Sequence, residues 1–250
     1  FVGNDTDYQP EIYAWGFRNP FRISFDRNDY NNTTASNYPF YVSATAETLF
    51  ESTYKVNGPG NYGWAIREGT LCIARSQPLV PPYTINCTTD NDCPSGPQTI
   101  TCGTDGFCTC TDIDPILGGP IHGPILEYVN LAASDFDESA ALTEKGLLDE
   151  GLGKASLGGF IYRGSDISWL YGMFVQGDFA LDLLDGQIFV AKEPEAESDG
   201  LWSLERAYVF NATDPVYSGF VKSISQDTGG ELYAVTGAFT PTGLIGRVFK

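Results

Sequence analysis

Arg18 and Asn19 are the side chains of this sequence best suited to bind a charged group. They stand between two short runs of aromatic and β-branched residues, 12–17 and 22–26. An arginine between two apolar strands must pair with a carboxylate, a carbonyl or a bound anion, because an unpaired buried charge is costly. We favour a structural arginine that fixes a corner over a contact to a cofactor or substrate.

The six cysteines are a second set of residues with the potential for chemistry, and all of them lie in the segment from Cys72 to Cys110. An even number of cysteines in a stretch rich in Thr, Asp, Gly and Pro is typical of disulfides. A zinc site is the alternative, but there is no C-x2-C pair and His122 is the only histidine. We predict three disulfides, and the sequence does not choose among the fifteen pairings. The cysteines are Cys72, Cys87, Cys93, Cys102, Cys108 and Cys110.

Sequons for N-linked glycans occur in four regions of the chain. Their asparagines are Asn4, Asn31, Asn32, Asn86 and Asn211. Together with the disulfides, they indicate a secreted, extracellular eukaryotic glycoprotein. No apolar run is long enough to cross a bilayer, and no signal peptide precedes Phe1, so we expect a processed product or a piece of a longer chain.

The remaining charges and His122 set limits on function. A net charge of −18 argues against nucleic acid and anionic lipid as partners. Calcium takes clustered oxygen ligands, but no EF-hand-type loop is present, and we predict no metal site. His122 has an unperturbed pKa near neutral, yet in the turn-rich loop 118–124 an ordinary histidine is favoured over a catalytic base.

The elements that must position these residues are short strands. Aromatic residues make up 14% of the chain, with 28 Gly and 15 Pro, which favours strands and tight turns. Pro20 marks a break between the first two runs. We predict strands at 12–17, 23–26, 160–163, 173–178, 187–191, 221–225 and 232–236, in antiparallel four-stranded sheets.

Two internal similarities indicate a repeat. Segments 185–190 and 229–234 share a turn-Gly-polar-aliphatic-aromatic pattern, and their glycines are 44 residues apart, which matches one propeller blade. Segment 23–26 (Ile-Ser-Phe-Asp) resembles 224–227 (Ile-Ser-Gln-Asp). Two insertions interrupt the pattern: a cysteine-rich one at 71–114, and an acidic one at 130–154 in which a short helix is predicted to begin near Ser134.

Several blocks, in order along the chain, resemble the glucose/sorbosone dehydrogenase family. They are Glu-Ile-Tyr-Ala-Trp-Gly-Phe-Arg-Asn-Pro at 11–20, Gly-Asn-Tyr-Gly-Trp at 60–64, Leu-Gly-Gly-Phe-Ile-Tyr-Arg-Gly at 157–164, Gly-Asp-Phe at 177–179 and Gly-Glu-Leu-Tyr at 230–233. This family includes soluble quinoprotein sugar dehydrogenases and the propeller domain of hedgehog-interacting protein and its relatives. The resemblance implies an all-β, six-bladed β-propeller, of which residues 1–250 are similar to about the three C-terminal blades.

The resemblance also bears on activity. In the quinoprotein branch it would place pyrroloquinoline quinone against Arg18 and Asn19, but the non-catalytic branch has the same Arg-Asn-Pro. Other groups of the enzymes are missing: the base histidine, the cofactor lysine near Asp185, and the aspartate-containing loop, where this chain has Ser-Ala-Thr-Ala at 43–46. Leu157 stands where threonine is expected.

These observations predict a secreted, non-catalytic glycoprotein: a propeller module without a cofactor that acts in an extracellular or cell-surface assembly. Half a propeller leaves open sheet edges, so its partners would be the remaining propeller half or neighbouring chains. Carbohydrate is a further candidate partner, since Trp15, Trp64, Trp169 and Trp202 could line a shelf, although packing between blades is favoured. The alternative is the C-terminal half of an aldose dehydrogenase that uses pyrroloquinoline quinone and calcium.

Overall fold

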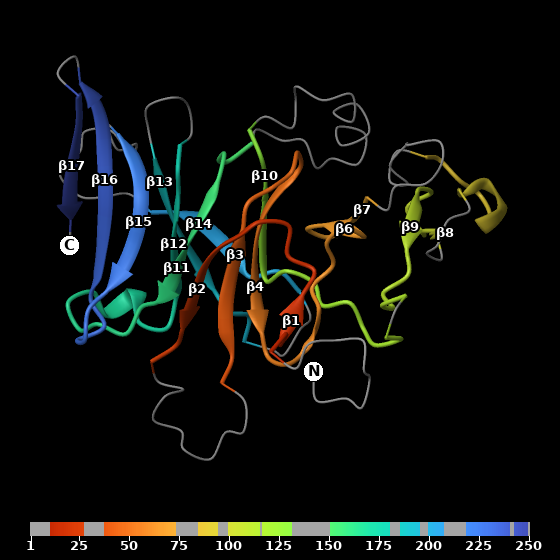
Figure 1. Ribbon diagram of the computed structural model, residues 1–250, viewed down its shortest axis with the longest axis horizontal. Coiled ribbons are helices and arrows are strands. Elements are labelled where there is room, and N and C mark those ends of the chain that lie inside the picture. Colours follow the sequence, from red (N-terminus) through yellow and green to blue (C-terminus); the bar gives the residue numbers. More distant parts are fainter. Residues whose placement is uncertain are drawn as a thin grey trace.

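The described part of the chain folds mainly into antiparallel sheets and contains almost no helix (Figure 1). The computed structural model describes residues 11–27, 38–73, 85–94, 100–115, 117–131, 151–180, 186–195, 200–207, 219–240 and 243–249. Within these ranges the helical elements are two single turns, η3 (Asp90–Asp92) and η5 (Ser168–Leu170). No helix in the described ranges has the length and hydropathy to cross a membrane. The prediction of an all-β protein is confirmed.

The first sheet has four antiparallel strands in the order β10-β4-β3-β2. They are β2 (Pro20–Phe25), β3 (Phe40–Ala44), β4 (Phe50–Val56) and β10 (Leu126–Val129). Aromatic and β-branched residues recur in all four strands, which suits a pleated surface that is buried on one face or both.

The second and third sheets also follow chain order. The second is β11 (Ser156–Ile161), β12 (Phe174–Asp178), β13 (Gln187–Lys192) and β14 (Ser203–Arg206). The third is β15 (Phe220–Gln226), β16 (Leu232–Thr240) and β17 (Gly243–Phe249). The prediction of antiparallel four-stranded sheets is therefore confirmed for two sheets, while the number of propeller blades stays a prediction.

Three short pairs complete the described strands. Strand β1 (Ala14–Trp15) pairs in parallel with β5 (Gly60–Asn61). Strands β6 (Arg67–Glu68) and β7 (Leu71–Cys72) form one antiparallel pair, and β8 (Ile100–Cys102) and β9 (Cys108–Cys110) form another. Figure 1 shows β8 and β9 at the end of the molecule farthest from the third sheet.

The three large sheets pack side by side, with their first strands β2, β11 and β15 as neighbours. Apolar side chains fill the space between the second and third sheets, where Val175 and Val190 pack with Val221 and Ile224. The contact is close: a Cβ atom on Gly186 would lie 2.2 Å from the backbone nitrogen of Val221. Glycine is therefore required there by packing.

The N-terminal strand prediction is wrong in extent and pairing. Instead of a strand over 12–17, only β1 is formed, and it pairs outside the large sheets. Gly16 has φ +81°, and a Cβ there would lie 2.2 Å from Oδ1 of Asn61, so the chain turns away at this point. Pro20 does not separate the strands but begins β2, a position that needs no backbone donor because β2 is an edge strand.

The two sequence similarities have different outcomes. Segment 185–190 leads into β13, the third strand of its sheet, whereas 229–234 leads into β16, the second strand of its own. The 44-residue spacing therefore does not mark equivalent positions. Segments 23–26 and 224–227 do correspond, since β2 and β15 are both first strands. The helix predicted near Ser134 lies outside the described residues.

Candidate functional site

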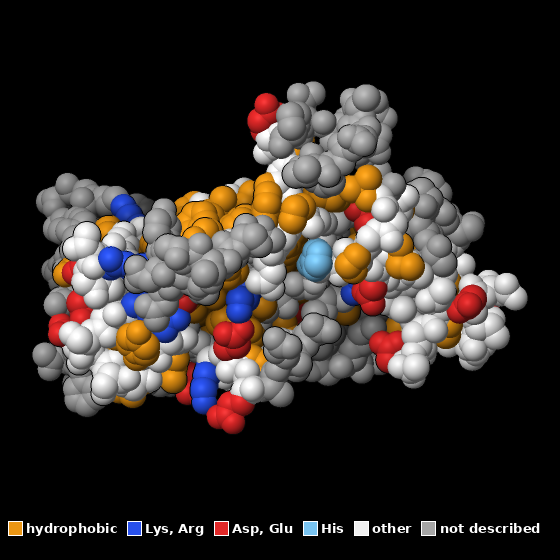
Figure 2. Space-filling model, turned by 90° about the horizontal axis from the view of Figure 1, so that it is seen from below, with side chains coloured by type: hydrophobic (Ala, Val, Ile, Leu, Met, Phe, Trp, Pro, Cys, Tyr) orange, Lys and Arg blue, Asp and Glu red, His pale blue; other side chains and the backbone are white. Residues whose placement is uncertain are grey.

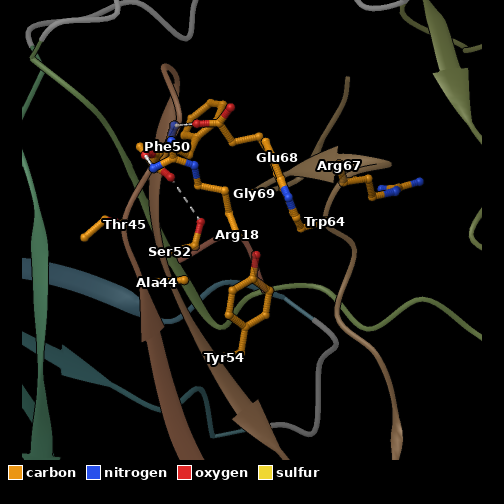
Figure 3. Close-up of a pocket in the computed structure, with 11 residues that line it drawn as sticks. Arg18, Ala44, Thr45, Phe50, Ser52, Tyr54, Trp64, Arg67, Glu68 and Gly69 are labelled. Atoms are coloured by element: carbon orange, nitrogen blue, oxygen red, sulfur yellow. Dashed lines mark hydrogen bonds between the residues drawn. The ribbon is translucent and has the colours of Figure 1, made fainter. Parts of the chain in front are cut away.

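Arg18 and Asn19 are consecutive residues at the corner between β1 and β2, and both bind the loop that follows β3. Figure 3 shows Arg18 close to Thr45 of this loop. Nη1 of Arg18 donates to the carbonyl oxygen of Ala46. Nδ2 of Asn19 donates to Oγ1 of Thr45 at 2.7 Å, and the Asn19 carbonyl accepts the Thr45 N–H at 3.1 Å. Both residues are exposed at the surface. The arginine thus has the carbonyl partner that the sequence required.

The loop that receives these contacts is itself fixed by Glu68. Oε1 of this buried carboxylate accepts the backbone N–H groups of residues 47, 48, 49 and 50, at 2.7 to 3.2 Å. Hydrogen bonds from several backbone donors to one carboxylate are strong and orient the loop. The segment 43–46 therefore belongs to a corner that hydrogen bonds hold on both sides.

The cavity at this corner is small. Arg18, Ser52, Tyr54, Trp64 and Arg67 are among its lining residues, and its volume is about 10 Å³. That is room for about one water molecule. The guanidinium carbon of Arg18 lies 6.0 Å from the Trp64 ring centroid. Arg67 has partners outside the cavity, because Nη2 lies 2.6 Å from Asp112 and donates to the Cys110 carbonyl at 2.8 Å.

Arg22, unlike Arg18, is half-buried, and it joins all three large sheets. From β2, its Nε donates to the Leu157 carbonyl of β11 at 2.9 Å. Its Nη2 donates to Oγ of Ser223 on β15 at 2.8 Å. The sequence pattern predicts a strand that includes Arg22 but assigns this residue no role. A charge among the apolar residues of that strand is the signal that could identify it.

A buried polar cluster lies between the first and second sheets. Oε2 of Glu51, on β4, accepts the backbone N–H of Ser156 at 2.6 Å, and Oε1 accepts Nδ2 of Asn130 at 2.8 Å. Asp178, on β12, accepts the hydroxyl of Tyr128 at 2.6 Å. Both carboxyl groups are fully buried. These contacts fasten β11 and β12 to the first sheet.

The same burial shifts the pKa values of this cluster. Desolvation raises the pKa of Glu51 to about 7, and the charge of Asp178 acts in the same direction. Desolvation also raises the pKa of Asp178 to about 6. Raised carboxyl pKa values are a feature of catalytic acids, but these groups are enclosed and hydrogen-bonded to backbone, which indicates a structural role. The sequence offered one signal for them, an acidic residue within a strand.

Trp15, Trp64 and His122 lie near strand β5, but the four tryptophans differ widely in burial. His122 is exposed, seen as the pale blue side chain of Figure 2, and stacks on Tyr62 with ring centroids 5.0 Å apart. Trp202 is buried against Tyr41, whereas Trp169 has 65% of its surface exposed. Trp15 and Trp64 are half-buried.

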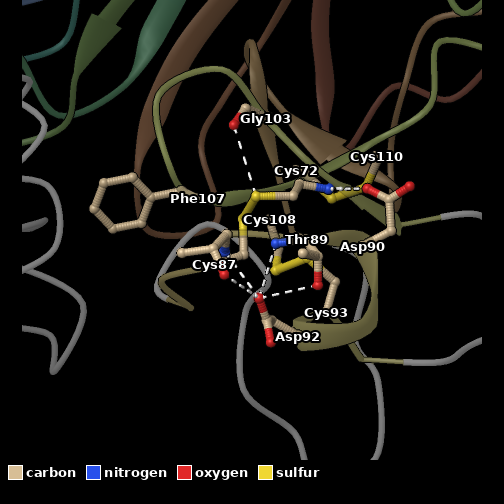
Figure 4. Close-up of a disulfide and its surroundings, with 12 residues drawn as sticks. Cys72, Cys87, Thr89, Asp90, Asp92, Cys93, Gly103, Phe107, Cys108 and Cys110 are labelled. Carbon is tan, nitrogen blue, oxygen red and sulfur yellow. Dashed lines mark hydrogen bonds between the residues drawn. A yellow bond between two sulfur atoms is a disulfide. The ribbon is translucent and has the colours of Figure 1, made fainter.

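All six cysteines form disulfides, which confirms that part of the prediction (Figure 4). The pairs are Cys72–Cys110, Cys87–Cys102 and Cys93–Cys108. The sulfur atoms of Cys87, Cys93 and Cys108 lie within 4.8 Å of one another, the one such grouping of metal-ligating side chains in the described residues. Because each is in a disulfide, none offers the thiolate that zinc requires.

Among the sequon asparagines, Asn86 falls within the described residues and is exposed. Asn4, Asn31, Asn32 and Asn211 lie outside them. Most of the acidic segment 130–154 also lies outside, so its boundaries, like those of 71–114, stay predictions.

The chain is similar to two proteins of Arabidopsis thaliana. Over 81 residues, 32% of this chain and 10% of the relative, it is 36% identical to the HIPL2 protein. Over 244 residues, 93% of this chain and 27% of the relative, it is 21% identical to the HIPL1 protein. The matched parts thus span about a quarter or less of these relatives, and no protein-family model matches the sequence. This likeness is weak and agrees with the hedgehog-interacting-protein side of the resemblance, while the link to sugar dehydrogenases stays a prediction.

Proposed function

We propose that this chain is a secreted, non-catalytic module of propeller-type sheets that acts in an extracellular or cell-surface assembly. The observation that carries the proposal is the hydrogen bonding of the two side chains at the corner between β1 and β2. The side chains of Arg18 and Asn19 are both bound to their own loop, beside a cavity of about 10 Å³.

A quinone cofactor does not match this corner. Pyrroloquinoline quinone carries three carboxylates, and several cationic contacts are needed to offset their desolvation. Of the two arginines that line the cavity, Arg67 is paired with Asp112 and Arg18 is bound to Ala46. The cavity beside them has a volume of only about 10 Å³. We therefore assign Arg18 and Asn19 to the architecture of the corner.

Two features support a propeller-type arrangement. The first strands of successive sheets are neighbours, as radial repetition requires. In addition, β2 exposes Phe21, Ile23 and Phe25 at 51%, 57% and 48% of their surface. Figure 2 shows apolar side chains gathered in a band along the molecule. A row of three exposed apolar side chains on one strand is typical of a surface that another sheet covers, supplied here by a longer parent chain or a neighbouring chain.

Secretion is supported by the three disulfides, which persist in oxidising compartments. In the cysteine-rich segment they take the place of a larger apolar core. Export would also place the chain where neighbouring extracellular proteins are available as partners.

Reconstitution tests the absence of catalysis. The native protein is incubated with pyrroloquinoline quinone and calcium, and then with an aldose and an artificial electron acceptor. We expect no turnover, and no change in quinone absorbance or fluorescence that would indicate binding. Turnover that is lost in Arg18→Ala, but retained in the matched variant Arg27→Ala, would overturn the proposal and restore the enzyme.

The assembly role needs a separate measurement. Intact mass spectrometry of native material would give the true chain length, its glycans and any associated chain. We expect the 250 residues to be recovered with further sheets, either covalently continuous or tightly associated. Recovery of an isolated monomer of this length would contradict the assembly role.

A further inference from the structure

Asn86 stands out among the side chains of the cysteine-rich segment. It begins the sequon Asn86-Cys87-Thr88, and its side chain is exposed while that of Cys87 is buried. Asn86 has no hydrogen-bonded side-chain partner among the described residues. A glycan on Asn86 would therefore extend into solvent without disturbing the small core that Cys87 helps to form.

In the folded chain, however, hydrogen bonds and a disulfide fix the conformation of this sequon, which would hinder glycan transfer. The backbone N–H of Cys87 donates to Gly106 at 2.8 Å, and that of Cys108 donates to Ile85 at 3.0 Å. Oγ1 of Thr88 donates to Oδ2 of Asp92 at 3.0 Å. Cys87 is also cross-linked to Cys102. The segment is thus fixed on both sides, and the threonine hydroxyl is already engaged.

Glycan transfer needs a flexible acceptor. The asparagine amide and the hydroxyl two residues later must enter one enzyme site together, and the amide must approach a sugar carbon. Neither condition suits a segment that two backbone hydrogen bonds and a disulfide hold in place. The unfolded, reduced chain meets both, because neither Asn86 nor Thr88 is constrained there.

We propose that Asn86 carries an N-linked glycan, added before Cys87 pairs with Cys102, so that disulfide closure competes with glycan transfer. The donor is a lipid-pyrophosphate-linked oligosaccharide of the secretory pathway. A bond forms between the Asn86 amide nitrogen and the anomeric carbon, the bond from that carbon to the pyrophosphate oxygen breaks, and the amide loses one proton. No electrons are transferred. The proposal rests on the proposed secretion of the chain.

The competition has a measurable consequence, which is partial occupancy. A chain that closes Cys87–Cys102 first leaves Asn86 bare, and a chain that receives the glycan first still folds, because Asn86 faces solvent. The sequons at Asn4, Asn32 and Asn211 contain no cysteine and serve as controls within the same molecule. Their occupancy does not depend on the Cys87–Cys102 bridge.

The experiment expresses all 250 residues behind a cleavable secretion leader in eukaryotic cells. Occupancy at each sequon is read by glycosidase treatment in heavy-oxygen water and peptide mass spectrometry. Wild type is expected to be partly occupied at Asn86, Thr88→Ala to be bare there, and Thr88→Ser to retain the glycan. Cys102→Ser keeps the sequon but removes the competing bridge, so occupancy at Asn86 is expected to rise while the other sequons do not change. A pulse of reductant during synthesis of wild type should have the same effect.

Two results would overturn the inference. An Asn86 that is bare in wild type and in Cys102→Ser would remove the site. Equal occupancy in wild type, in Cys102→Ser and after the reductant pulse would remove the competition. Failure of secretion itself would be seen separately, as retained chains with free thiols, and the peptide measurement on those retained chains would still report on Asn86.

Discussion

Arg22 of β2 donates a hydrogen bond from Nη2 to Oγ of Ser223 on β15, at 2.8 Å and across 201 residues of chain. Through Nε the same guanidinium reaches the Leu157 carbonyl of β11 at 2.9 Å. One side chain therefore joins the first strands of all three large sheets. An arginine suits this position because its rigid fork of donors can serve two acceptors at once.

Arg22→Ala is expected to reduce the free energy of unfolding by about 2–3 kcal/mol, because two hydrogen bonds from a charged donor are lost and their acceptors remain partly buried. Arg22→Lys should recover only part of this loss, since one ammonium cannot span both acceptors. Urea unfolding followed by tryptophan fluorescence measures both variants. Lys192→Ala, whose ion pair with Glu195 is exposed, is the control and should stay within about 0.5 kcal/mol of wild type. Equal effects of Arg22→Ala and Lys192→Ala would contradict the joining role.

Glu51 should make stability depend on pH. Burial raises its pKa from 4.5 to about 7. Between these values the folded state binds more protons than the unfolded state, so stability is full below about pH 4.5 and is lost as pH rises toward 7. We expect the urea midpoint to fall over this interval, by a free energy on the order of 2 kcal/mol. Asp178, with its pKa raised to about 6, adds to the fall in the same direction.

The matched variants separate Glu51 from the general effect of pH. Glu51→Gln cannot ionise, so its unfolding midpoint should change less with pH than that of wild type, although it loses stability at every pH because the amide cannot accept from all of its present donors. Glu193 forms an exposed ion pair with Lys55. In Glu193→Gln, the unfolding midpoint should therefore change with pH as steeply as in wild type. A Glu51→Gln slope equal to that of wild type would contradict the assignment.

The sequence predicted those elements that local patterns decide. Strands near β12, β13, β15 and β16 follow from alternating apolar residues beside Gly turns, and disulfides follow from cysteine count and composition. The pairing of the cysteines depends on which loops approach one another, and no local pattern reports that. The same holds for Gly16, whose close approach to Asn61 ends β1 and makes the first strand prediction too long.

The candidate site shows the same limit. The need of Arg18 for a polar partner could be predicted from its neighbours, but the identity of that partner, the Ala46 carbonyl, depends on the path of the loop after β3. Arg22, Glu51 and Asp178 were missed because each is a polar residue in a strand that was read for its apolar residues. The role of such a residue is recognised once its partner is known, and these partners lie between 50 and 201 residues away in the sequence.

The disulfide pairs lead to a prediction about the cysteine-rich segment. Alkylation without reductant should add no label to the native protein, because no cysteine is free. Cys72 and Cys110 close the longest loop, with a separation of 38 residues, and their joint replacement by serine should cost about 4 kcal/mol of stability. Joint replacement of Cys87 and Cys102, separated by 15 residues, should cost about 3 kcal/mol. Thermal unfolding measures both, and labelling of native wild type would contradict the pairing.

The exposed row on β2 gives the last prediction. Phe21, Ile23 and Phe25 have 51%, 57% and 48% of their surface exposed, so the 250-residue chain alone should bind a hydrophobic dye and self-associate. Ile23→Lys should reduce both without loss of stability, because this side chain faces solvent when the covering sheet is absent. In the proposed assembly the same change should weaken association, since a lysine would be buried without a partner. Leu201 is the control site, since it is apolar, 45% exposed and near β14. Leu201→Lys should change neither dye binding nor self-association.

Dye fluorescence measures dye binding by the isolated chain, and light scattering measures its self-association. Native mass spectrometry measures association with other chains. If Ile23→Lys matches wild type in all three measurements, β2 is not a covered face.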